Sequence, residues 1–163
     1  MRIRILVTGG TFDKEYDELT GRLFFKDTHL PEMLRRGRCL LDVVEETVMM
    51  VDSLDMDDAS RAAVVARARD CDEANVVVTH GTDTMVQTAR ALAAAGIPDK
   101  TIVLTGALNP ARFRGSDAEF NIGTAVGAVQ SLPPGVYIAM NGRIWDPLKV
   151  RKNVAANRFE AVG

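Results

Sequence analysis

Two short segments of the sequence carry side chains that could perform nucleophilic chemistry. ILVTGGTF (Ile5–Phe12) and VVVTHGTDTM (Val76–Met85) are apolar runs that end in glycines and threonines, and the second adds a histidine and an aspartate. A threonine hydroxyl is a poor nucleophile unless a base takes its proton, and lysine is the usual alternative to histidine for that task. If the two segment ends meet, they predict one site built around threonine hydroxyls.

The glycines of the first segment have a second interpretation. Paired glycines let the backbone turn sharply and bring its N–H groups close to a ligand, but the same residues also make an ordinary turn with capping hydroxyls. A dinucleotide-binding fingerprint needs a third glycine opening a helix, which GGTFDKEYD (Gly9–Asp17) lacks. The chain has no phosphate-binding Walker pattern either, so nucleotide binding is not predicted.

The second segment also has a structural interpretation. Asp83 or Thr82 suits the cap of a helix that begins near Thr84. His80 is a candidate base, although a single histidine after a buried strand is more often a packed or hydrogen-bonded ring. The sequence leaves these interpretations open.

Short β-branched runs alternate along the chain with helical patterns. Strands covered on both faces are short and almost wholly apolar, as are Ile3–Val7, Val76–Thr79, Ile102–Thr105 and Val136–Met140. The segments between them predict helices at Leu30–Gly37, Asp57–Asp70, Thr84–Gly96 and Asp117–Leu132. A less regular strand is expected within Leu40–Asp52, either bent or broken into two.

This alternation predicts the α/β class. Strand and helix in repeated succession give a mainly parallel sheet with helices on both faces, a three-layer αβα sandwich of flavodoxin-like or Rossmann-like type. The 163 residues suffice for one such domain, residues 1–163, and not comfortably for two. Ligands of these sheets bind outside the carboxyl ends of the strands, which is where both segments place their threonines.

The composition argues against several classes of partner. The net charge is −2 and the basic residues are dispersed, so neither nucleic acid nor a membrane surface is expected as a partner. No apolar run reaches the roughly 20 residues that span a bilayer. The chain starts directly with a strand-like segment, so we expect a cytoplasmic protein without a signal peptide. Its two cysteines form no CxxC pair and it has only two histidines, so no zinc site is predicted.

The two segments together resemble the paired signatures of the bacterial-type L-asparaginases, which are threonine amidohydrolases. TGGTF and HGTDTM carry the likeness, and DSLDM (Asp52–Met56), TGALNPARFRGSDAEFNI (Thr105–Ile122) and MNGRIWDPLKVRKN (Met140–Asn153) extend it. It covers nearly the whole chain but only the amino-terminal domain of the two-domain members, so the chain resembles the short, single-domain ones. The resemblance implies hydrolysis of L-asparagine to L-aspartate and ammonia, without a metal or an organic cofactor.

The resemblance implies catalytic roles at five positions. Thr11 matches the nucleophile that attacks the side-chain amide and forms an acyl-enzyme. Tyr16 is the candidate for the tyrosine that contacts this nucleophile, unless it is a surface aromatic. Thr82, Asp83 and Lys152 match a second group, in which the aspartate holds the lysine and the lysine positions the threonine.

The resemblance also implies how a substrate is bound. Ser53 matches the residue that takes the α-carboxylate, Asp83 also meets the α-ammonium, and backbone N–H groups after the first two strands supply oxyanion donors. The full predicted set of substrate-binding residues is Gly10, Ser53, Asp55, Gly81, Thr82, Asp83 and Ala107.

Three departures from the family pattern bear on the substrate. Leu54 stands where the family usually has a glutamine, so Asp55 or another group must take the ammonium. An acid that the two-domain members borrow from the second domain of a neighbouring chain has no counterpart here, so Glu15, Asp13 or an acid of a partner chain must replace it. Phe12 replaces the usual isoleucine, which changes packing only.

Other interpretations of the same residues remain. Lys149 and Arg151 compete with Lys152 as the cation of its segment. The substrate could be another small amide, or the chain could be a non-catalytic module that senses an amino acid. We also expect a homodimer or a higher homo-oligomer, because a site at an exposed sheet edge needs cover.

Overall fold

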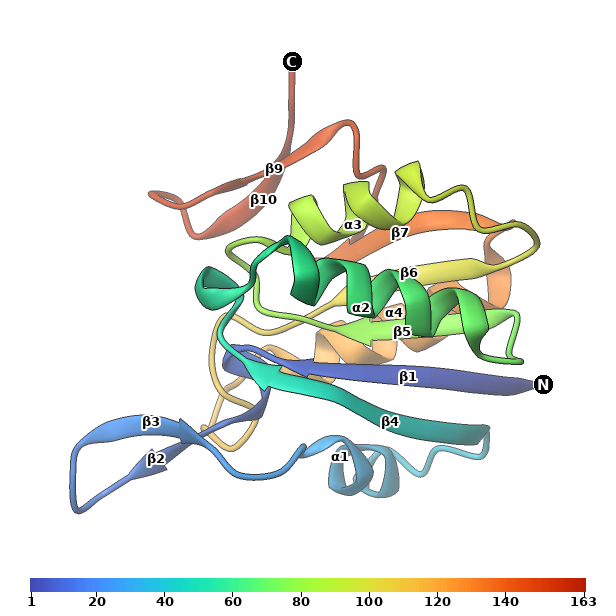
Figure 1. Ribbon diagram of the computed structural model, residues 1–163. Coiled ribbons are helices and arrows are strands. Elements are labelled where there is room, and N and C mark those ends of the chain that lie inside the picture. The colour runs from blue at the N-terminus through green and yellow to red at the C-terminus, as the bar shows by residue number, and fades with distance from the viewer.

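The computed structural model describes residues 1–163 and confirms a mainly parallel sheet between two layers of helices (Figure 1). Six strands make up this sheet, and the first five run parallel while the last is antiparallel. In spatial order they are β4 (Asp42–Val51), β1 (Arg2–Gly9), β5 (Asn75–Thr79), β6 (Thr101–Thr105), β7 (Gly135–Met140) and β8 (Arg143–Trp145).

The strand order determines where a ligand can bind. The chain passes from β1 to β4 on one side and then crosses to β5 on the other side of β1. The connections therefore leave the carboxyl ends of β1 and β5 in opposite directions, which opens a crevice at that point of the sheet. Val7 of β1 and Thr79 of β5 lie side by side in the parallel register at this edge.

Four helices cover the two faces of the sheet. Helices α2 (Asp58–Asp70) and α3 (Met85–Ala94) lie on one face, and α1 (Leu30–Arg36) and α4 (Ala118–Ser131) lie on the other (Figure 1). Successive side chains of a strand point to opposite faces, so Ile5 joins the core under α1 and α4 and Leu6 joins the core under α2 and α3. Both faces are covered, which explains why the strands are apolar throughout.

Most predicted elements lie where the sequence placed them. The four apolar strands and the four helices are all present, with ends that differ from the predicted ones by at most two residues. The segment Leu40–Asp52 forms one strand, β4, and is not broken in two. Its pairing with β1 shifts register between Val7 and Gly9, so the irregular pattern corresponds to a local bulge.

Two hairpins and two turns complete the chain, and sequence reasoning did not predict the hairpins. Strands β2 (Lys14–Asp17) and β3 (Arg22–Phe25) project from the body, and β9 (Val150–Asn153) and β10 (Arg158–Ala161) lie beside α3 (Figure 1). Both hairpins lie at the end of the molecule where the parallel strands end. The short 3-10 turns η1 (Thr11–Asp13) and η2 (Ser53–Asp55) follow β1 and β4. None of the helices has the length and apolar character needed to cross a membrane.

Candidate active site

Three loops pack closely against one another at the carboxyl ends of β1, β4 and β5. A Cβ atom on Gly10 would lie 2.4 Å from the backbone nitrogen of Gly81, and one on Gly81 would lie 2.5 Å from Ser53 Oγ. The N–H of Gly10 also donates to the carbonyl of Val51 at 2.9 Å. Only glycine allows so close an approach, and Gly10 has a φ of 78°, which other residues rarely adopt. The two glycine-threonine segments therefore do meet, with the Ser53 turn beside them.

A substitution at Gly10 tests this close approach. Gly10→Ala forces a strained φ and an overlap with the Gly81 backbone, so we expect it to lower the free energy of unfolding by about 2–4 kcal/mol. Gly127→Ala is the matched control, because a Cβ there has no neighbour within 4 Å and alanine is the better helix former. Urea denaturation of both variants measures the difference. Equal stability of the two would contradict the packing described.

Thr11 and Ser53 each begin a turn at this edge of the sheet. Thr11 is half-buried at the start of η1, and Ser53 is 1% exposed at the start of η2. The carbonyl of Ser53 accepts a hydrogen bond of 2.7 Å from the hydroxyl of Thr84, which ties its turn to the start of α3. The hydroxyls of Thr11 and Ser53 make no hydrogen bond within the chain, so both are available to a ligand.

Lys152 joins the second threonine to an acid. Its ammonium group donates to Thr82 Oγ1 at 2.7 Å and to Asp83 Oδ1 at 2.5 Å. Because an ammonium only donates, the oxygen of Thr82 accepts, and its own hydroxyl hydrogen stays free to point at a ligand. The competing cations lie elsewhere: Lys149 is exposed beside Asp146, and Arg151 pairs with Glu160. The structure thus places Lys152, of the three cations, at the threonine.

The expected helix cap does not form. Helix α3 begins at Met85 with Thr84 as its N-cap residue, and no side chain caps it, so the prediction that Asp83 or Thr82 does so is wrong. The side chains of Thr82 and Asp83 bond instead to Lys152, which is distant in the sequence. Hydrogen bonds to a charged donor are about twice as strong as neutral ones, so the ammonium outcompetes the helix N–H groups.

The position of Lys152 depends on how its hairpin is anchored. Val150 and Phe159, on β9 and β10, are buried in the core beside α3. Arg90 of α3 donates to the carbonyls of Pro147 at 2.9 Å and Val150 at 3.4 Å, which fastens the start of β9 to the helix. Sequence reasoning missed Arg90. The available signal was that it is the one charged residue within α3.

His80 is a packed ring within the structure. It is fully buried, with Nδ1 2.7 Å from the carbonyl of Gly81 and Nε2 2.7 Å from the hydroxyl of Thr88. Burial lowers the pKa of His80 to about 4, the bond to the Gly81 carbonyl opposes this shift, and Arg61 adds to it. The ring is neutral at pH 7 and both nitrogens are used, which favours the structural interpretation over a role as base.

The low pKa of His80 predicts a pH dependence of stability. The ring titrates near pH 6.5 in the unfolded chain and near pH 4 in the folded one. Between these values the unfolded chain binds the extra proton. The free energy of unfolding therefore falls by up to about 3 kcal/mol as the pH drops from 6.5 to 4. Above pH 6.5 His80 is neutral in both states and lowers the free energy of unfolding no further.

Urea denaturation across this pH range, with His80→Gln as the reference, measures the contribution of the ring. The difference in stability between wild type and variant should shrink as the pH falls. A constant difference would show that His80 keeps its ordinary pKa in the folded state.

Besides Thr11 and Ser53, whose hydroxyls make no hydrogen bond within the chain, three predicted residues make no side-chain hydrogen bond to Thr82, Asp83 or Lys152. Tyr16 is 56% exposed on β2, and its hydroxyl lies 3.9 Å from where a Cβ of Gly21 would be, at the turn of its own hairpin. Asp55 is exposed in η2, and its side chain has no ion-pair partner. Ala107 is fully buried after β6, so only its backbone can face a ligand. The roles assigned to these residues stay predictions.

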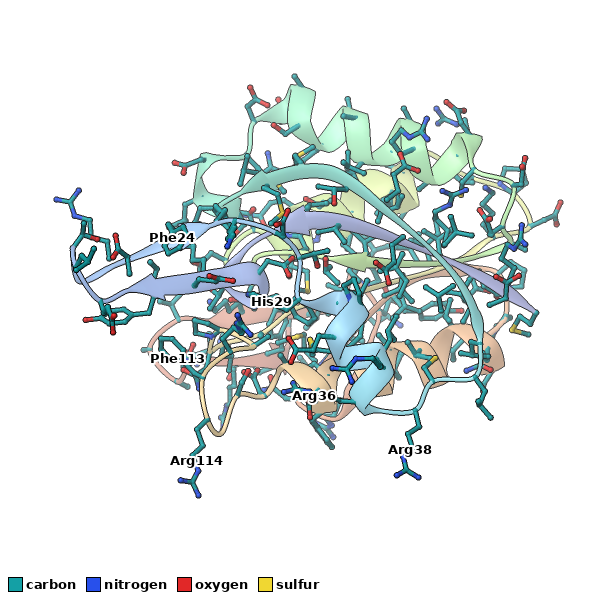
Figure 2. The ribbon with its side chains drawn as sticks, turned by 90° about the horizontal axis from the view of Figure 1, so that it is seen from below. Phe24, His29, Arg36, Arg38, Phe113 and Arg114 are labelled. Carbon is teal, nitrogen blue, oxygen red and sulfur yellow. The ribbon has the colours of Figure 1, made fainter.

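Asp13 cannot take the part of the acid that the two-domain family members use, so this one of the three expected alternatives is wrong. Asp13 is fully buried, and its Oδ1 accepts 2.9 Å hydrogen bonds from the Thr28 hydroxyl and the His29 N–H. Burial raises the pKa of Asp13, while the two hydrogen bonds oppose the shift. Glu15 also points toward the body, 3.7 Å from His29 Nε2, at the base of the hairpin where Figure 2 labels His29.

The clustered groups suit acyl transfer. The edge offers two threonine hydroxyls and an ammonium held by a carboxylate, which are components that nucleophilic attack on an amide requires. No group of three or more His, Cys, Asp or Glu side chains is arranged to hold a metal ion. A cavity of about 470 Å³ lies between α1 and α4, away from these groups, and is lined by Met33, Leu34, Ile122, Val126 and their neighbours.

Comparisons with known proteins give the same family from sequence and from structure. L-asparaginase 2 of Escherichia coli is 32% identical over 161 residues, which cover 92% of this chain and 46% of that protein. A glutamyl-tRNA(Gln) amidotransferase subunit of Methanococcus vannielii is 32% identical over 173 residues, covering 96% of this chain and 39% of that protein. The chain thus spans less than half the length of these relatives.

Solved structures show the same fold. The structure of a probable cytoplasmic L-asparaginase from Campylobacter jejuni matches 98% of this chain and 52% of its own, with a TM-score of 0.84 and 30% identity. The thermostable L-asparaginase from Thermococcus kodakarensis matches 99% of this chain and 51% of its own, with a TM-score of 0.81 and 24% identity. The family model described as "Asparaginase, N-terminal" matches residues 2–162, so the chain belongs to the asparaginase family by the amino-terminal domain of that family.

Proposed function

We propose that this protein hydrolyses the side-chain amide of L-asparagine to L-aspartate and ammonia, through an acyl-enzyme on Thr11. The observation that carries the proposal is the bonding of Lys152 to both Thr82 and Asp83. This pair of bonds lies at the edge of the sheet where Gly10 packs on Gly81. Family membership supports the reaction class.

In the first half-reaction, Thr11 Oγ1 attacks the amide carbon and the carbonyl oxygen becomes an oxyanion. Collapse of this intermediate breaks the C–N bond and leaves an ester on Thr11. Ammonia departs only if the nitrogen gains the proton that Thr11 loses. The hydroxyl of Thr82 can pass this proton, because its oxygen accepts from Lys152 and its hydrogen is free.

In the second half-reaction, a water molecule attacks the ester carbon. The C–O bond to Thr11 breaks, one proton of the water returns to Thr11 Oγ1, and the acid product forms. The ammonium of Lys152 stabilises negative charge that develops on the Thr82 oxygen, and Asp83 holds the ammonium in place. The same residues therefore serve both halves of the reaction.

Substrate binding follows from the free atoms at the edge. The Ser53 hydroxyl is free to donate to the α-carboxylate, and the second oxygen of Asp83 is free to accept from the α-ammonium. Leu54 is 71% exposed and offers neither a donor nor an acceptor in its side chain. We propose that recognition of the amino group rests on Asp83 and Asp55, or that another small amide takes the place of asparagine.

A second candidate function is that of an amidotransferase component. Several relatives are named as subunits of glutamyl-tRNA(Gln) amidotransferase, and the one cited above matches 96% of this chain. In such an assembly the amide nitrogen would pass to a partner's substrate. A purely sensory role is disfavoured, because a binding module needs no ammonium–carboxylate pair bonded to a threonine.

We further propose that the protein is cytoplasmic, a term that the name of the Campylobacter jejuni relative uses for that protein. We also propose that a second copy of the chain covers the site in a homo-oligomer. Large apolar side chains are exposed on the elements that flank the sheet edge, namely Tyr16, Leu19, Leu54, Leu148 and Val154. Cover by another chain would remove this surface from water. Sedimentation showing a fully active monomer at assay concentration would contradict the oligomer.

The release of ammonia from a panel of amides tests the function. L-asparagine, L-glutamine and simple amides without an α-amino group are incubated separately with the purified chain, and ammonia and the acid product are quantified. We expect equal amounts of ammonia and L-aspartate from L-asparagine. No release from any amide, with L-aspartate still bound, would favour the sensor. Release that depends on a partner protein would favour the amidotransferase component.

A further inference from the structure

An ion pair joins the β2–β3 hairpin to the Ser53 turn. Lys14 lies at the start of β2, three residues after Thr11, and Asp52 immediately precedes Ser53. The ammonium of Lys14 donates to Asp52 Oδ2, while Asp52 Oδ1 accepts the N–H of Leu54 at 3.0 Å. One carboxylate therefore caps the turn that carries Ser53 and holds the strand that follows Thr11.

This pair is more shielded than an ordinary surface ion pair. The side chains of Lys14 and Asp52 are 18% and 29% exposed. The Lys14 ammonium also lies 5.6 Å from the ring centroid of Phe25, its partner in the hairpin register. Burial opposes ionisation of Asp52, but hydrogen bonds from Lys14 and the Leu54 N–H outweigh it and lower the pKa of Asp52. Asp52 is therefore a carboxylate at neutral pH.

A carboxylate at this place needs a counter-charge when the site binds an anionic group. Under the proposed function, the α-carboxylate of the substrate binds at Ser53, the residue next to Asp52. The substrate carboxylate and the Asp52 carboxylate are both negative and therefore repel each other. Solvent and salt screen this repulsion only partly in a half-buried site. The charges of Lys14 and Lys152 both act on Asp52, and Lys14 is the one that bonds directly to it, so Lys14 can cancel most of this repulsion.

We propose that Lys14 is a positioning residue that balances the charge of Asp52 beside the substrate carboxylate and fastens the hairpin to the Ser53 turn. This inference rests on the proposed function. Alternate side chains of a strand share a face, so Lys14 and Tyr16 lie on the same face of β2. The bond from Lys14 to Asp52 holds this face toward the Ser53 turn. The pair thereby links the turn that begins at Thr11 to the turn that begins at Ser53.

Four variants distinguish the balancing of the Asp52 charge by Lys14 from a purely structural role of Lys14 in fastening the hairpin. They are Lys14→Met, Asp52→Asn, the double variant, and Lys14→Arg, with Lys26→Met as the matched control because Lys26 forms no ion pair. We expect Lys14→Met to raise KM for L-asparagine about tenfold, with kcat changed less than about threefold, since Asp52 loses its bonded cation, keeps only the charge of Lys152, and repels the substrate. Asp52→Asn removes the repelling charge and should change KM by less than about threefold.

The double variant is decisive. If Lys14 balances charge, Asp52→Asn added to Lys14→Met brings KM back to within about threefold of wild type, and Lys14→Arg stays close to wild type. If KM of the double variant is as high as that of Lys14→Met, the charge-balancing role is overturned. An unchanged KM in Lys14→Met also overturns it.

A measurement without substrate keeps the inference separate from the proposed function. Hydrogen exchange at the Leu54 amide reports the turn that Asp52 caps, and we expect it to be about tenfold faster in Lys14→Met than in Lys26→Met. If wild type hydrolyses no amide, the proposed function fails. Hydrogen exchange at the Leu54 amide then still tests whether the Lys14–Asp52 ion pair stabilises the Ser53 turn. Equal exchange in the two variants would overturn the coupling.

Discussion

Thr11→Val is expected to lower kcat/KM for L-asparagine at least about 10³-fold, because it removes the hydroxyl that forms the acyl-enzyme. Valine has nearly the shape of threonine. The Thr11 hydroxyl makes no hydrogen bond within the chain, so the free energy of unfolding should change by less than about 1 kcal/mol. Steady-state ammonia release and urea denaturation on the same preparation measure both quantities.

Thr124→Val is the matched control for this variant. Thr124 lies on α4, and its hydroxyl bonds only to the carbonyl of Phe120 within the same helix. It should keep wild-type activity, and the Thr11→Val protein should still bind L-aspartate. Substantial turnover by correctly folded Thr11→Val would exclude Thr11 as the nucleophile.

Lys152→Met is expected to lower kcat about 10²–10⁴-fold while leaving the chain folded. The methionine keeps the length of the side chain but removes the charge that bonds to Thr82 and Asp83. Thr82 then has no donor to stabilise charge on its oxygen. Asp83 is 37% exposed, so water can solvate it, and the stability cost should be about 1 kcal/mol or less.

Lys149→Met tests whether the loss of any lysine from this segment lowers kcat. Lys149 is 81% exposed and lies 4.0 Å from Asp146, so its loss should leave turnover unchanged within about twofold. Rate measurements of both variants with saturating L-asparagine give the comparison in kcat. If Lys149→Met is as damaged as Lys152→Met, or if Lys152→Met is fully active, the Lys152 assignment is wrong.

The catalytic predictions separate the roles of the two threonine segments. Thr11→Val removes the acyl-enzyme, so no ester should accumulate in it. Lys152→Met retains the nucleophile and impairs the proton transfer of both steps. Rapid quenching followed by mass measurement of the protein should therefore detect no acyl adduct in Thr11→Val, and an aspartyl adduct in Lys152→Met where deacylation loses more rate than acylation.

Much of the fold could be predicted from the sequence because local patterns dictate it. A β-branched run such as Val76–Thr79 favours extended backbone, and its apolar side chains require cover on both faces. Acid-capped and alanine-rich segments favour helices, as Asp57 does by capping α2 through the N–H of Ser60. Alternation of these elements is enough to predict a parallel sheet and therefore the edge at which a ligand binds.

The hairpins could not be predicted because their stabilising contacts are distant in the sequence. KEYD (Lys14–Asp17) is highly charged and has no apolar alternation, and β2 is fastened by Asp52, which another segment supplies. The same holds for β9, whose position depends on Arg90 and on burial of Phe159. Local propensity carries no information on such partners.

The sequence by itself determined the sheet, its covering helices and the edge at which two threonine segments end, because these follow from short-range periodicity and chain connectivity. Only the tertiary structure decided that Gly10 packs against Gly81, that Lys152 among three cations reaches Thr82, and that Asp13 is buried. Each of these outcomes depends on which segments, distant in the sequence, come together in the fold. Their meeting is settled by distance and burial in three dimensions, which no local pattern encodes.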